Sequence, residues 1–103
     1  MARITKKFAR GAMSSVAEGS EFLCTNGKSF SNLDELELGL AMMDDSAFNF
    51  HTNGEENHFS SWISEAIVDG KLSRSVKRVS DRYLAAKKVK DRRQQLNKRL
   101  GKS

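Results

Sequence analysis

The sequence predicts a mainly α fold with a minor β-hairpin: a small helical domain that carries a projecting basic helix at its C-terminus. Three observations support this fold class. Apolar residues recur at helical spacing between residues 31 and 79, an Asn-Gly turn signal follows a short apolar run, and residues 80–103 are rich in Lys and Arg but poor in apolar residues. A chain of 103 residues has room for one modest core.

The N-terminal segment differs from the middle of the chain. Residues 1–20 show no sustained apolar period and are rich in Ala, Ser, Gly and basic residues, which predicts a flexible basic arm. We expect a compact helical domain over residues 21–79 and a basic C-terminal helix over residues 80–103.

A short strand is predicted at residues 21–27, where the sequence EFLCTNG ends in the turn signal Asn26-Gly27. Residues 28–30 can form a brief return strand. Because a two-stranded hairpin is only marginally stable alone, we expect it to lie on the helices. Cys24, the only cysteine, is expected to be buried in the strand.

Two helices follow the hairpin. The first begins near Ser31, where a hydroxyl residue is followed three positions later by Asp34, and it ends before the charged pair Asp44-Asp45. The second is predicted over residues 57–69, with Asn57 as N-cap and Gly70 as its stop. Its amphipathic stripe consists of Phe59, Trp62, Ile63, Ala66 and Ile67.

The C-terminal part of the chain predicts a short third helix around Leu72 and Val76, then a final helix of about twenty residues capped by Ser80 or Asp81. Arginines stand in the middle of this last helix, where a further apolar contact is expected. A helix so poor in apolar residues is expected to project from the domain. Its thin apolar stripe consists of Ala85, Val89, Leu96 and Leu100.

Residues 48–63 hold both histidines and the only tryptophan, residue types that can form either a metal site or a packing cluster. A site built on His51 and His58 would need Glu55, Glu56 or Cys24 to complete it, and this spacing does not match the close, repeated spacing of zinc ligands. We therefore predict a turn at residues 52–54, packing roles for the histidines and no metal or other cofactor. No group of residues marks a catalytic site, so the sequence predicts that the protein is not an enzyme.

The pattern H…N-x-F-x-x-W-I runs from His51 through Asn57 and Phe59 to Trp62-Ile63. With these residues, the segment 22–72 resembles a small prokaryotic domain family of unknown function, known mainly from archaeal proteins. Members of that family usually carry an acid where this chain has His58. The resemblance implies the limits of a folded domain and implies no activity. The other matching positions are Phe22, Asn26, Gly27, Ser31, Leu33, Glu35, Leu36, Leu40, Met43, Asp44, Phe48 and Leu72.

Opposite charges are segregated along the chain. Residues 21–70 carry ten acids and one base, whereas residues 71–103 carry thirteen bases and two acids. A Lys/Arg-rich helix can neutralise phosphates, so we expect a nucleic acid, DNA or RNA, as partner, with backbone contacts and weak sequence preference. The candidate contacts are Lys71, Arg74, Lys77, Arg78, Arg82, Lys87, Lys88, Lys90, Arg92, Arg93, Lys98 and Arg99.

An alternative is a protein-interaction or assembly module, in which the stripe Val89, Leu96, Leu100 pairs with another helix. Because like charges on two copies of this basic helix would repel, an acidic partner protein is expected. A membrane partner is not expected, since no apolar run approaches the roughly 20 residues that span a bilayer and the basic helix lacks a bulky apolar face. A lone cysteine and the absence of a signal-peptide pattern favour a cytoplasmic location.

Overall fold

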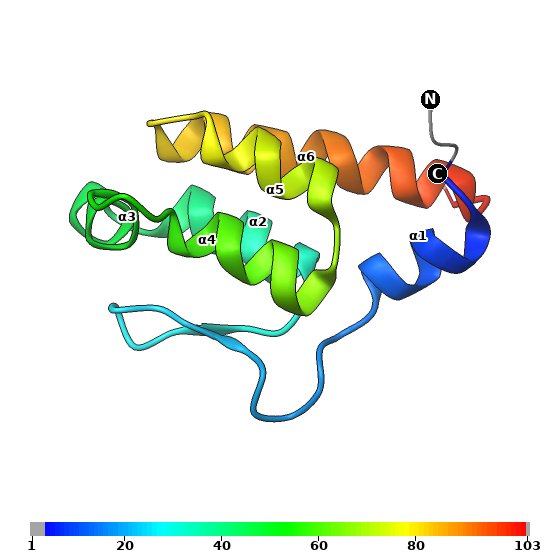
Figure 1. Ribbon diagram of the computed structural model, residues 1–103, viewed down its shortest axis with the longest axis horizontal. Coiled ribbons are helices and arrows are strands. Elements are labelled where there is room, and N and C mark those ends of the chain that lie inside the picture. The colour runs from blue at the N-terminus through cyan, green and yellow to red at the C-terminus, as the bar shows by residue number, and fades with distance from the viewer. Residues whose placement is uncertain (1–3, 103) are drawn as a thin grey trace.

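In the computed structural model, residues 4–102 are described, and they form six α-helices, one π-helical turn and one antiparallel hairpin (Figure 1). In chain order the elements are α1 (Lys6–Met13), β1 (Phe22–Leu23), β2 (Ser29–Phe30), α2 (Leu33–Met42), α3 (Asp45–Thr52), α4 (His58–Trp62), η1 (Ile63–Ile67), α5 (Gly70–Lys77) and α6 (Arg82–Arg99). The predicted mainly α fold with a minor hairpin is confirmed.

The hairpin forms where the sequence predicted it. Phe22 pairs with Phe30 across the two strands, and Leu23 pairs with Ser29. Gly27 has a φ of 89°, a left-handed backbone that glycine adopts without steric cost, which explains why the turn falls at this position. The short strands thus turn back within a few residues and present one aromatic side chain each to the core.

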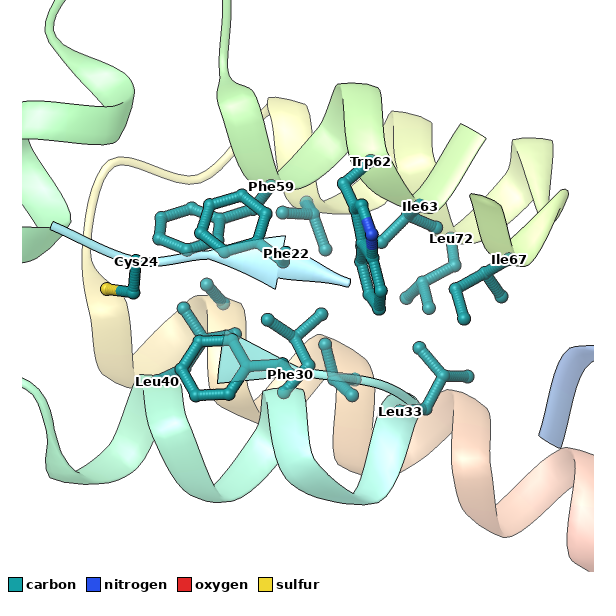
Figure 2. Packing of buried hydrophobic residues seen from close by; sticks show 14 of the residues in the cluster. Phe22, Cys24, Phe30, Leu33, Leu40, Phe59, Trp62, Ile63, Ile67 and Leu72 are labelled. Carbon is teal, nitrogen blue, oxygen red and sulfur yellow. The ribbon is translucent and has the colours of Figure 1, made fainter. Parts of the chain in front are cut away.

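The hairpin packs across α4 on one side and α2 on the other (Figure 2). The ring of Phe22 stacks on Phe59 of α4 with the centroids 4.8 Å apart. The ring of Phe30 lies directly over Gly39 of α2, where a Cβ atom would approach its Cζ to 2.2 Å. The hairpin is therefore part of the core, as the marginal stability of an isolated hairpin required.

Helix α2 begins one residue later than the sequence indicated. Its N-cap is Asn32, whose side chain accepts the backbone N–H of Glu35 at 2.9 Å. The carboxylate of Glu35 in turn accepts the N–H of Ser31 at 2.7 Å. Both bonds fix the helix start one residue beyond the predicted one, and the capping role belongs to the amide of Asn32 and not to the hydroxyl of Ser31.

The second predicted helix is divided. Asn57 caps it as expected, accepting the N–H of Ser60 at 3.0 Å, but its last turn, η1, is π-helical. The turn ends at Val68, whose φ of 64° is left-handed, and Gly70 is the first residue of α5. The predicted stop at Gly70 is therefore wrong: the chain reverses two residues earlier, and Asp69 caps the next helix.

Two helices were not predicted. α1 lies inside the segment expected to be a flexible arm, and it buries Ala9 and Ala12, whose small side chains give a weak apolar signal. The part of that arm at residues 1–3 lies outside the described residues, as does residue 103 of the C-terminal helix. α3 follows the break at Asp44, which is its N-cap, and it buries Phe48 while Phe50 stays exposed.

The C-terminal helix begins at its predicted cap, Asp81, but it does not project. α6 lies along α2 and also contacts α1 and α5. Ala85, Val89 and Leu96 on its inner side are fully buried. The helix therefore contributes to the core, because its thin apolar stripe faces three other helices instead of solvent.

Candidate nucleic-acid interface

The structure divides the twelve predicted contact residues into two groups. Arg82, Arg92 and Arg93 are partly or fully buried, and the remaining nine are exposed. The exposed group consists of Lys71, Arg74, Lys77 and Arg78 at α5 and Lys87, Lys88, Lys90, Lys98 and Arg99 on α6. We call these nine residues the basic surface.

The basic surface spans two packed helices. A short turn joins α5 to α6, and Asp69 at the start of α5 meets Arg92 in the middle of α6, so the two helices run antiparallel. They lie together along the edge of the molecule opposite the hairpin (Figure 1). On α5, Lys71, Arg74 and Arg78 recur every three or four residues and so share one exposed face.

Arg92 does not belong to this surface, because it makes a buried ion pair with Asp69. Its Nε lies 2.7 Å from Oδ2 and its Nη2 lies 3.1 Å from Oδ1 of that carboxylate. Only 8% of Arg92 is exposed, and Asp69 is fully buried. The two charges therefore neutralise each other inside the protein, and the pair joins the start of α5 to α6.

Arg82 is used to close the end of α2. Its Nη1 donates to the carbonyl oxygen of Ala41 at 2.8 Å, and its Nε pairs with Asp45 at 3.0 Å. A cation placed on the last carbonyls of a helix satisfies acceptors that lack a partner in the helix and interacts favourably with the helix dipole. In the structure the guanidinium of Arg82 is therefore engaged in contacts within the protein.

Arg93 joins α6 to the acidic side of α2. Its guanidinium pairs with Glu37 and with Asp34, whose Oδ1 lies 2.5 Å from Nε without the alignment of a hydrogen bond. Partial burial opposes the charge of Arg93, but the hydrogen bond with Glu37 and the charge of Asp34 outweigh it and raise the pKa of the guanidinium. Arg93 is therefore a charged internal bridge.

Most of the basic surface has no such partner. Lys87 pairs with Asp91 one turn along α6, at 2.9 Å, and both side chains are largely exposed. Across residues 4–102, no carboxylate oxygen lies within 4.0 Å of a side-chain nitrogen of the other eight residues. Their charges are therefore available to an external anion.

Two shallow grooves adjoin the basic surface. One, of about 370 Å³, lies between the ends of α3 and α5 and is lined by Lys77 and Arg78 together with the amides of Asn49 and Asn53. The other, of about 440 Å³, lies beside α6 and is lined by Lys90, Lys98 and Lys102, with Glu37 and Arg93 at its α2 side. Lys102, which follows the last residue of α6, was not among the predicted contacts.

Helix α1 adds cations that the sequence prediction also left out of the site. Lys6, Lys7 and Arg10 are exposed, and α1 packs on α6. The positive charge of the N-terminal segment thus lies beside that of the C-terminal helix. The sequence predicted that the N-terminal segment is basic, but its proximity to α6 depends on a helix that the sequence did not reveal.

The apolar stripe on which the alternative assembly role depends is not available to a partner. Val89 and Leu96, which were expected to pair with another helix, are completely buried, and Leu100 is partly buried against the same core. The contact predicted for an external partner is made within the chain. A coiled-coil interface along this stripe is therefore excluded while α6 remains docked.

The two histidines are not part of the basic surface. His51 is buried, and its Nδ1 lies 3.1 Å from Nδ1 of His58, while its Nε2 accepts the backbone N–H of Thr25 at 3.0 Å. When one ring nitrogen of a histidine binds a metal, the other carries a proton. The N–H of Thr25 can only donate, so Nε2 of His51 must be unprotonated, and Nδ1 of this ring is therefore not free to bind a metal. Within residues 4–102, no group of three or more His, Cys, Asp or Glu residues is placed to hold a metal ion.

Comparison with known proteins adds no relative. No model of a known protein family, no curated protein and no solved structure matches this chain. The resemblance to the archaeal family therefore stays a prediction. Among the described residues, no helix combines the length and apolar character needed to cross a membrane.

Proposed function

We propose that this protein binds nucleic acid through phosphate contacts made by the basic surface of α5 and α6. The observation that carries the proposal is the division of the cations: three arginines pair with carboxylates of the protein itself, while nine Lys and Arg side chains remain exposed at two packed helices. Clustered surface cations attract phosphates and gain free energy by releasing the counterions of the polymer.

The kind of cation supports backbone contacts without base recognition. Six of the nine exposed residues are lysines, which meet phosphate as point charges, whereas bidentate recognition is the strength of arginine. Tyr83, the one aromatic residue of α6, accepts a hydrogen bond from Arg82 at 2.7 Å and lies under the same guanidinium. Base stacking would have to displace that contact, so we expect weak sequence preference.

The proposal predicts a steep salt dependence that depends on the α5 face. For about five phosphate contacts, log affinity for duplex DNA falls against log salt with a slope near −4.5. The triple variant Lys71→Gln, Arg74→Gln, Arg78→Gln should reduce that slope by about 2.7, since each contact contributes roughly 0.9. Fluorescence anisotropy with an unrelated duplex, at salt concentrations from about 50 to about 200 mM, measures this slope.

Two single substitutions of the same type, one inside and one outside the basic surface, give a matched comparison. Lys28→Gln removes the single cation of residues 21–70, and Lys88→Gln removes one charge from the basic surface. Lys88→Gln should weaken binding, and Lys28→Gln should leave it unchanged. Equal effects of the two substitutions, or no salt-sensitive binding by the wild type, would overturn the proposal. Deletion of α6 is unsuitable as a test, because it removes core residues.

An acidic protein is the second candidate partner for the same surface, since it also presents clustered negative charge. Polyglutamate at equal charge concentration separates the two: it should compete weakly with a duplex, because the duplex carries a denser line of charge and releases more counterions on binding. Complete competition at equal charge concentration would favour the acidic protein.

A further inference from the structure

The two histidines form a hydrogen-bonded chain that ends on the hairpin. The N–H of Thr25, next to the β1–β2 turn, donates to Nε2 of His51 on α3. The other ring nitrogen of His51 lies 3.1 Å from Nδ1 of His58 on α4. His51 is 6% exposed, and His58 is exposed to solvent. The chain thus links three elements through two rings.

This geometry determines where the ring protons lie. Thr25 N–H can only donate, so Nε2 of His51 must be unprotonated, and the proton of the neutral ring is on Nδ1. That Nδ1–H donates to Nδ1 of His58, whose own proton is then on the exposed Nε2. Both lone pairs that could accept a further proton are already occupied by hydrogen bonds.

We propose that the His51–His58 pair is a proton-operated latch, which holds the hairpin turn against α3 at neutral pH and releases it when the pair takes up a proton. Protonation of His58 at Nδ1 breaks its bond with His51 and leaves a buried N–H without an acceptor. Protonation of His51 at Nε2 places two N–H groups face to face and breaks the bond to Thr25. Neither ring can become charged without opening the chain.

The charged and titratable groups around the pair come from each neighbouring segment. Glu55 and Glu56, in the loop before α4, line the same surface depression as His58. The hairpin contributes Cys24, which is buried, and Lys28, which is exposed. The backbone N–H of Cys24 donates to the carbonyl oxygen of Lys28. Burial and the charge of His58 hold the pKa of His51 below its usual value. The ring of His58 is exposed to solvent and therefore gives a proton access to the pair.

The segment that the latch releases contains the only cysteine. Cys24 precedes Thr25 and is 7% exposed, in a turn whose other hydrogen bonds all lie within residues 24–28. Opening the turn exposes this thiol and uncovers the aromatic ring of Phe22, which contacts His51 with the centroids 5.0 Å apart. The inference rests on these contacts alone and is independent of nucleic-acid binding.

The first test is the ring tautomer of the wild-type protein. Nitrogen-15 correlation spectra of the imidazole rings at neutral pH should show His51 protonated on Nδ1 and His58 on Nε2. The Thr25 amide should then lose at least about tenfold of its exchange protection between pH 7.5 and 5, the effect of losing roughly one hydrogen bond. A neutral His51 protonated on Nε2, or protection unchanged by acid, would refute the latch.

The second test uses variants at constant pH, so that the ionisation of the thiol itself does not interfere. His51→Phe removes the acceptor of Thr25 and should speed labelling of Cys24 at neutral pH. His58→Gln keeps an acceptor for His51 but cannot titrate, so labelling should stay slow and the acid-induced loss of Thr25 protection should shift to lower pH. An acid response in His58→Gln identical to that of the wild type would overturn the role of His58.

Discussion

A single ion pair shows how much of the charge of this protein is structural. Asp69 and Arg92 are both buried and make two hydrogen bonds to each other, and Asp69 also caps α5 by accepting the N–H of Leu72 at 3.2 Å. Gln95 accepts a further hydrogen bond from Arg92. The pair therefore joins the start of one helix to the centre of another. It stabilises the fold only while both partners are present, because either charge alone would be buried without a counter-charge.

Removing one charge from this pair should be severe. Asp69→Asn keeps a side chain that can cap a helix but leaves the guanidinium of Arg92 buried without a counter-charge, so we expect a loss of about 3–5 kcal/mol in the free energy of unfolding. Urea denaturation measures it. The double variant Asp69→Asn, Arg92→Met should lose less than the single variant. A single substitution that costs nothing would show that the pair is not buried in solution.

The buried histidine makes stability depend on pH. Burial, and the charge of His58, lower the pKa of His51 in the folded state, so below the unfolded-state pKa of about 6.5 the unfolded chain binds more protons. Stability should therefore be fully present above that pH and decline below it, by at most about 1.4 kcal/mol per pH unit for one proton. Urea denaturation at several pH values checks this, and His51→Gln should flatten the decline.

The sequence identified single residues well where local chemistry decides their role. Cys24 is buried, Asn57 and Asp81 are helix caps, and His51 is a hydrogen-bonded packing residue, as predicted. It could not identify Arg92 or Arg93 as internal bridges. Their partners are 23 or more positions away in sequence, so no spacing rule connects them.

At the scale of elements, one close approach determines how the hairpin sits on α2. Gly39→Ala should destabilise the protein by about 1–3 kcal/mol, because the new Cβ meets the buried ring of Phe30 and this overpacking outweighs a helix-propensity gain of about 1 kcal/mol. Gly11→Ala in α1 is the matched control. Nothing lies within 4 Å of its new Cβ, so the change should stabilise by about 0.5–1 kcal/mol. Thermal unfolding compares the two, and equal shifts would contradict the packing of the hairpin.

The elements that the sequence missed are the short ones. α3 spans Asp45–Thr52 and buries residues at only two turns, so its apolar residues do not repeat often enough to reveal a helical period. α1 buries alanines, which any hydrophobicity pattern weighs lightly. By contrast, α2 and α4 with η1 have long stripes of large apolar residues, and both were predicted close to their observed limits.

At the scale of the whole molecule, the cations of the C-terminal part of the chain have two separate roles. One is internal pairing: Arg82, Arg92 and Arg93 bind carboxylates that precede them in sequence and so hold α6 on the domain. The other is to form a surface, which consists of exposed cations of α5 and α6 with those of α1 beside them. Charge counts predicted the surface and could not separate it from the pairing, because only the packing of α6 decides which cations face inwards.

The measurement that tests the central claim most directly is a map of backbone amide chemical shifts during titration with an unrelated DNA duplex at low salt. We expect the changes to concentrate at the exposed positions of α5 and α6, around Arg74, Lys88 and Lys98, and to disappear as salt is raised. The hairpin, which lies on the opposite side of the molecule, should be unaffected. Changes centred on that opposite face, or a spectrum that does not respond to DNA, would contradict the account.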